Sequence, residues 1–367
     1  MKLRIVTLLG VLVVSLLSVP SVFAQKFAVN GKMTPDIRSE FTFQNLSDGN
    51  QYNHMDGAGR LRWTLEGRIE NKDTGFYVYS KVQPLVNVAG TLTFDDSYGQ
   101  FGNKSFYLKL GRFEAELLNE KNEDLFTPRT SDLGIYKTPL PYRADNAWGR
   151  RAGDFALGFN ASPSVLFELS GVYGNLKDTQ TFYTLADMTA AATTASATVN
   201  EIGLRPAVRY TYTLNKTSSV IVKAGFDYLT YTPKDADAKG ANTKVGFGGQ
   251  VIGLFGGLKV SMGAGSFNET NDSWKDGTSF PDQRTTTVGG GFMYTTAAKH
   301  IIGLSGFYTT EDLYDSKDLY VYGAFEYRLP LESVAYVKLA PGFATGTDIY
   351  GTDVKTYGAR VRFDYYL

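Results

Sequence analysis

Strict alternation of apolar and polar residues over long segments is the feature that most limits what this chain can fold into. In residues 27–44 the odd positions are mainly apolar, among them Phe27, Val29 and Phe41, while the even positions after Ala28 are polar. A period of two places these classes on opposite faces of a β-strand. About eighteen alternating residues exceed the ~5 to 6 of an average strand. A strand of this length can span a bilayer even when it is tilted. A soluble sandwich strand is the alternative for this segment alone.

The next alternating segment, residues 60–70, gathers charge on one face. Leu61, Trp63 and Leu65 share the apolar face. The opposite face carries Arg60, Arg62, Glu66, Arg68 and Glu70. Burying an unpaired charge costs several kcal/mol, so these five side chains need water or charged partners. One face of the expected sheet therefore lines a wet space.

The whole chain divides into sixteen such segments, an even number as in single-chain bacterial barrels. The least regular lies at 91–99. Short turns are expected near positions 71, 102, 163, 216, 256, 298 and 331, and longer loops near 50, 116–150, 185, 236, 275, 314 and 349. The Ala/Thr-rich run 189–198 could be a helix, but its threonines and missing caps favour a solvated loop. Because only closure satisfies every backbone group of a sheet in lipid, we predict an all-β transmembrane antiparallel β-barrel of sixteen strands.

The first 24 residues have the pattern of a secretory signal peptide. Lys2 and Arg4 precede an apolar core, and Pro20 precedes small-residue cleavage at Ala24. A retained membrane anchor is the alternative, but the apolar run is shorter than the ~20 residues of a spanning helix. No low-complexity linker follows, so we expect a signal peptide at 1–24 and one barrel domain at 25–367.

Composition excludes several classes of function. The chain has no Cys, which leaves no disulfide and no thiolate metal site. Lys plus Arg and Asp plus Glu are equal at 37 each, which argues against nucleic-acid binding through bulk positive charge. The two histidines, His54 and His300, are expected at opposite ends of the barrel, and no G-x-S-x-G or metal-ligand spacing occurs. We therefore expect that the protein is not an enzyme and that it binds no metal ion and no cofactor. An adhesive barrel would need larger loops.

Residues 111–153 interrupt the alternation with about forty residues of charged and aromatic sequence, a length that usually marks a functional loop. We predict that this third loop folds into the lumen and narrows it. Its acids, Glu114, Glu116, Glu120, Glu123, Asp124 and Asp132, would then face wall arginines across the water column. The expected wall residues are Arg38, Arg60, Arg62, Arg68, Arg360 and Arg362, because closure makes the last strand the neighbour of the first. The alternative is that these charges only keep a wide lumen wet and pair with one another.

The aromatic residues of the same segment admit two interpretations. Phe113, Tyr136, Tyr142 and Trp148 are candidates for stacking against sugar rings in the pore. They could equally pack the loop against the barrel wall, which is the interpretation we favour for Phe126.

Several of these features together resemble the Gram-negative trimeric porins over the whole mature chain: the signal peptide, the long first strand, the charged third loop and the aromatic closing strand. Leu110-Gly111-Arg112-Phe113-Glu114-Ala115, then Leu125-Phe126 and Gly149-Arg150-Arg151, are similar to the third loop of raffinose-type carbohydrate porins. Porins usually end in Phe, whereas this chain ends in Leu367.

The resemblance implies a water-filled channel of the bacterial outer membrane. It implies passive diffusion of small hydrophilic solutes such as oligosaccharides and ions, with carbohydrates favoured. The implied partners are outer-membrane lipids, the barrel-assembly machinery and two further copies in a homotrimer. General ion and solute diffusion without sugar preference is the alternative, ahead of an adhesive or enzymatic barrel.

Overall fold

The computed structural model describes residues 28–46, 51–87, 90–113, 115–116, 155–182, 193–233, 242–271, 280–313, 316–332, 335–347 and 353–366. At some of these strand positions the description covers the backbone only. The expected signal peptide and Leu367 lie outside the described residues.

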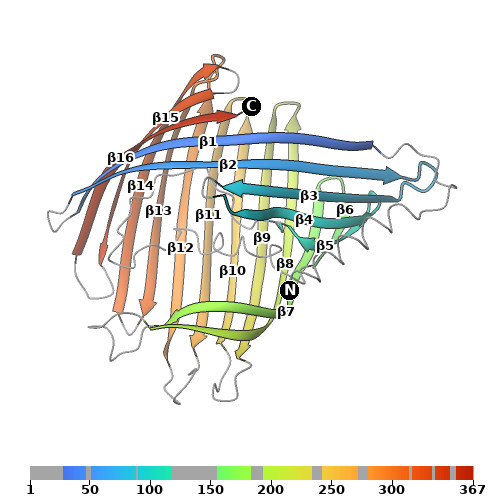
Figure 1. Cartoon of the computed structure of the whole chain (residues 1–367), viewed down its shortest axis with the longest axis horizontal. Coiled ribbons are helices and arrows are strands. Elements are labelled where there is room, and N and C mark those ends of the chain that lie inside the picture. The colour runs from blue at the N-terminus through green and yellow to red at the C-terminus, as the bar shows by residue number, and fades with distance from the viewer. Residues whose placement is uncertain are drawn as a thin grey trace.

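Within these residues the chain forms β-strands that pair antiparallel with their neighbours in the chain (Figure 1). The strands are β1 (Ala28–Leu46), β2 (Gln51–Glu70), β3 (Tyr77–Asn87), β4 (Leu92–Gly102), β5 (Phe106–Arg112), β6 (Phe155–Ser162), β7 (Val165–Phe182), β8 (Thr193–Asn215), β9 (Ser218–Pro233), β10 (Asn242–Phe255), β11 (Leu258–Asn271), β12 (Phe280–Thr295), β13 (Ile301–Leu313), β14 (Ser316–Glu332), β15 (Ala335–Thr347) and β16 (Asp353–Tyr366). The prediction of an all-β antiparallel architecture is confirmed.

The first and last strands close the sheet. β1 pairs with β16 in a continuous register that places Ile37 opposite Tyr365 and Thr42 opposite Arg360. In Figure 1, β1 to β4 run across the view while β9 to β13 run along its vertical, so the strand direction turns around the barrel. Closure removes the two free edges on which other chains could add strands. The barrel prediction is therefore confirmed.

Four of the loop predictions are wrong. The connections expected to be longer near positions 50, 314 and 349 are short, since β1 ends at Leu46 and β2 begins at Gln51, β13 ends at Leu313 and β14 begins at Ser316, and β15 ends at Thr347 and β16 begins at Asp353. Thr193–Thr198 forms the start of β8, where it pairs with Lys177–Phe182 of β7. β-Branched threonines suit an extended backbone, and here the pairing strand decides the conformation. The strand expected at 91–99 is present as β4.

β7 and β8 pair with each other beyond the point where their other neighbours stop. β6 accompanies β7 only as far as Gly171, and β9 accompanies β8 only from Val199 onward. The remaining pairs form a two-stranded ribbon, which turns across the lower end of the barrel in Figure 1.

The two faces of the sheet differ as the alternation predicts. On β8, Leu204 is 43% exposed while Arg205 is 1% exposed. Leu65 on β2 and Val78 on β3 are likewise about half exposed, beside the buried Tyr77. Further exposed apolar side chains include Leu157, Phe159, Phe167, Phe226, Phe247, Val251, Met262, Leu304 and Leu339. The outer surface is thus apolar on strands all around the barrel, and the inner face carries the polar groups.

Candidate functional site

The backbone leaves the barrel wall at the end of β5. Gly111 has a φ of 118°, a value that side-chain-bearing residues rarely adopt. A Cβ atom at this position would lie 2.4 Å from the backbone oxygen of Ser97 on β4. Beyond Arg112 the chain packs Phe113 and Ala115 against Ala156 and Tyr98, and Phe113 is completely buried. Glycine at 111 therefore permits the turn that carries the following residues away from the sheet.

We expect Gly111→Ala to destabilise the barrel by about 1–3 kcal/mol, because the side chain would be both strained and in contact with Ser97. Denaturant unfolding of the folded protein in detergent measures this loss. Gly99→Ala is the matched control, since no atom lies within 4 Å of a Cβ at position 99. Equal stability of the two variants would contradict the role of Gly111 in the turn.

Glu116, four residues after the end of β5, contacts two strands of the inner wall that do not neighbour β5. Its Oε2 accepts a hydrogen bond from Arg209 Nη1 on β8 at 2.9 Å, and its Oε1 lies 3.0 Å from Lys223 Nζ on β9. β8 and β9 stand three and four strands from β5 in the barrel order. Neighbouring strands are about 4.8 Å apart, and both cations belong to the inner face of the sheet, so Glu116 lies inside the barrel along the wall that follows β5. The described start of the long segment thus turns inward.

A second carboxylate holds the same segment by its backbone. Glu168 on β7 accepts the Glu116 backbone N–H at 2.7 Å with Oε1, and it accepts the Tyr107 hydroxyl with Oε2. Tyr107 reaches β7 from β5 because its ring lies over Gly158, where a Cβ would come within 2.1 Å of the ring. Side chain and backbone of Glu116 are therefore fixed to different strands.

Further charges on this part of the inner wall are also paired. Arg205 Nε lies 3.1 Å from Asp227 Oδ1, and both side chains are at most 5% exposed. Lys109 places its ammonium 4.9 Å from the centre of the Phe113 ring and 5.2 Å from that of Tyr98. Removing one partner from a buried ion pair typically costs 3–5 kcal/mol, so such pairs fix the wall geometry.

The inner wall of β2 to β4 combines aromatic rings with ion pairs. Tyr79 and Tyr98 have ring centres 6.0 Å apart, and Tyr79 donates to Glu66 at 2.8 Å. Lys81 pairs with Asp96 at 2.9 Å. This wall offers both flat apolar faces and charged groups, a combination that suits polar solutes.

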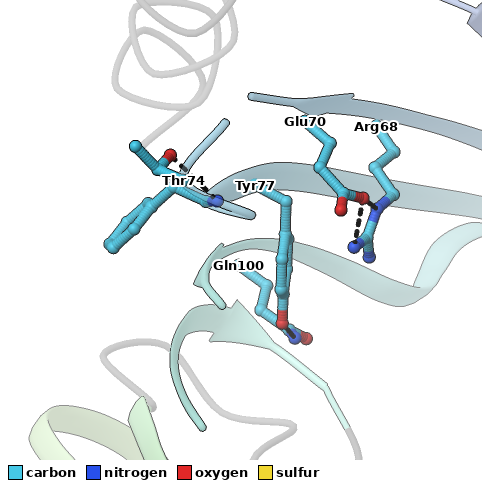
Figure 2. A network of polar contacts seen from close by, with 6 residues as sticks. Arg68, Glu70, Thr74, Tyr77 and Gln100 are labelled. Carbon is cyan, nitrogen blue, oxygen red and sulfur yellow. Dashed lines mark hydrogen bonds and ion pairs between the residues drawn. The ribbon is translucent and has the colours of Figure 1, made fainter. Parts of the chain in front are cut away.

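Figure 2 shows a separate polar network at the short turn between β2 and β3. Arg68 pairs with Glu70 at 2.8 Å and lies over the Tyr77 ring at 3.9 Å. Gln100 donates to the Tyr77 hydroxyl, and Thr74 accepts the N–H of Phe76. Arg68 thus pairs with an acid two residues away on its own strand, which favours the alternative that wall charges pair with one another at this position.

The structure divides the predicted site residues into three groups. Glu116 contacts Arg209 and Lys223, which are not among the predicted wall arginines, and the stacking role predicted for Phe113 is wrong because a fully buried ring offers no face to a solute. The acids and aromatics Glu114, Glu120, Glu123, Asp124, Asp132, Tyr136, Tyr142 and Trp148 lie outside the described residues. Arg62 is described as half-buried, and for Arg38, Arg60, Arg360 and Arg362 the backbone alone is described.

The partners of Glu116 were not predicted. A period of two along β8 and β9 is compatible with Arg209 and Lys223 on the inner face, but only the strand register puts them directly opposite each other. Apart from the same alternation, nothing in the sequence around Glu168 and Tyr107 indicates that they hold the backbone of Glu116.

Both histidines of the chain belong to the described residues, with the backbone alone described at His54. In that part of the chain no group of three or more His, Cys, Asp or Glu side chains could hold a metal ion. His300, after the β12–β13 turn, contacts the Tyr327 hydroxyl with Nδ1 at 2.8 Å, and His54 lies near the opposite end, on the first residues of β2. Among the described ranges, no helix is long and apolar enough to span a membrane.

A closed antiparallel barrel with an apolar exterior and a polar interior is the architecture of outer-membrane barrels. No protein family model and no curated protein matches this sequence. Among solved structures, the chain is similar to the trimer form of OmpT, an outer membrane protein of Vibrio cholerae, with a TM-score of 0.60 and 12% identity over 93% of this chain and all of that one. It is also similar to the outer membrane channel DcaP of Acinetobacter baumannii (TM-score 0.59, 12% identity, 93% and 98% covered). A third is the anion-selective porin from Comamonas acidovorans (TM-score 0.57, 12% identity, 93% and 100% covered). At identities this low, the structural similarity shows the fold alone.

Proposed function

We propose that this protein is a porin: a water-filled channel of the bacterial outer membrane through which small hydrophilic solutes diffuse passively. The observation that carries the proposal is the inward turn at Gly111, after which Glu116 contacts Arg209 and Lys223 on the inner wall of a closed barrel. Sixteen strands enclose more volume than side chains fill, so a segment inside the barrel narrows an opening. The exposed apolar side chains of the outer surface would contact outer-membrane lipids.

The third loop, residues 111–153, is proposed as the constriction. Its inward start supports this role, and the acids Glu120, Glu123, Asp124 and Asp132 would continue the charged lining. Tyr136, Tyr142 and Trp148 stay candidates for sugar stacking, which makes carbohydrates the proposed favoured solutes. The barrel-assembly machinery and a homotrimer complete the proposal, the latter because OmpT of Vibrio cholerae, a structural neighbour, exists in a trimer form.

General diffusion of ions and small solutes without sugar preference is the second candidate. It is favoured by the paired charges Arg205–Asp227, Lys81–Asp96 and Glu116 with its two cations, which line the described wall. A wall of this kind orients charged solutes through its local field.

Planar-bilayer recording of the purified protein tests both candidates. We expect stable ion-conducting steps, and reduced current when a trisaccharide is added if sugars bind in the pore. Steps without any sugar effect would support general diffusion, whereas the absence of conductance from a folded, inserted barrel would refute the channel itself.

A further inference from the structure

Two cations on the inner wall occupy directly opposed positions. Arg209 on β8 and Lys223 on β9 are cross-strand partners in the register of the sheet. Like charges at such positions repel, and Lys223 has only 4% of its side chain exposed. A buried ammonium beside a guanidinium requires a counter-anion close by. The two side chains therefore form a cationic receptor for an anion on the inner wall.

The carboxylate of Glu116 fills this receptor. One oxygen faces Arg209 and the other faces Lys223, at 2.9 and 3.0 Å. Such two-point contact is the way in which guanidinium and ammonium groups recognise carboxylate and phosphate oxyanions in general. The geometry of the site is thus that of an oxyanion site with an internal occupant.

Two observations make the occupant exchangeable. Arg209 has 39% of its side chain exposed, so an incoming oxyanion can approach the site from the guanidinium side. The backbone N–H of Glu116 is held separately by Glu168 at 2.7 Å. The Glu116 side chain can therefore leave the two cations while its backbone stays attached to the wall.

We propose that Arg209 and Lys223 form an oxyanion-binding site in the channel wall, that Glu116 occupies it in the resting state, and that solutes bearing a carboxylate or phosphate group compete with Glu116 for it. The proposal rests on the proposed channel function only in that the competing anion arrives through the lumen. Because Glu116 competes for the same two cations, it lowers the affinity of the Arg209–Lys223 site for a solute anion. The anion can then dissociate and pass through the channel.

Inorganic phosphate is the probe, at constant ionic strength maintained with chloride. In isothermal titration of the detergent-solubilised protein, we expect Glu116→Gln to bind phosphate at least tenfold more tightly than the wild type, because the amide no longer neutralises the two cations. Glu116→Gln combined with Arg209→Gln should lose this gain. Glu70→Gln removes the same charge at the network of Figure 2 and should bind phosphate as the wild type does.

The wild-type protein provides a second measurement, which decides the question even if the variants do not fold. Replacing chloride by phosphate should increase deuterium uptake in the peptide that contains Ala115 and Glu116, since without the two carboxylate contacts the bond to Glu168 holds the Glu116 amide with less support and opens more often. Unchanged deuterium uptake in this peptide would overturn the proposed oxyanion site. Equal phosphate affinity of Glu116→Gln and Glu70→Gln would overturn it as well. Phosphate binding without any conductance would support the site and refute the proposed channel.

Discussion

Removing residues 120–146 should at least roughly double the single-channel conductance and admit larger solutes, because a sixteen-stranded barrel without an inward loop encloses an open water column. The deletion keeps Gly111, the buried Phe113 and the Glu116 contacts to the wall, so the described start of the loop remains in place. Planar-bilayer recording gives the conductance, and exclusion of polymers of graded size gives the width of the pore.

The matched control shortens a different connection. Deleting residues 185–190 between β7 and β8 shortens a different connection and leaves Gly111 and the Glu116 contacts unchanged. This control should keep the wild-type conductance. If the 120–146 deletion also keeps it while the barrel remains folded, the third loop is not the constriction, and the central claim of the proposed function is wrong.

Leu204→Arg should impair membrane insertion more than tenfold. Leu204 lies on the outer face of β8 with 43% of its surface exposed, and an arginine facing lipid near the midplane costs about 2 to 4 kcal/mol. The fraction of protein that becomes protease-resistant after mixing with lipid vesicles measures insertion. Leu65→Arg on β2 should behave in the same way.

Leu214→Arg is the control for this prediction. Leu214 shares the outer face of β8 and is 50% exposed, but it lies next to the turn at 216–217, beyond Tyr210 and Tyr212. Arginine near the interface costs only about 0 to 1 kcal/mol, so this variant should insert almost normally. Equal insertion of Leu204→Arg and Leu214→Arg would show that the outer face of β8 does not contact the lipid interior.

Which residues face inward could be predicted because side chains alternate strictly along a strand. The alternation assigned Leu65 to the apolar face opposite the charged residues, and the structure confirms it as an exposed side chain of the outer surface. Strand ends were predicted less well: Thr193–Thr198 belongs to β8, because pairing with β7 outweighs the local composition that favoured a loop. The burial of Phe113 could not be predicted, since it depends on Ala156 and Tyr98 from other strands.

The sequence by itself determined the all-β class, the apolar and polar faces, and the presence of a charged segment that breaks the pattern after Arg112. These properties are local, because a period of two and a change of composition can be recognised in one stretch of chain. Only the tertiary structure decided which acid meets which cation. Arg209 and Lys223 become opposed through the register of β8 and β9, and Glu116 reaches them through the turn at Gly111. Contacts across a barrel depend on closure and register, which no single segment of the sequence encodes.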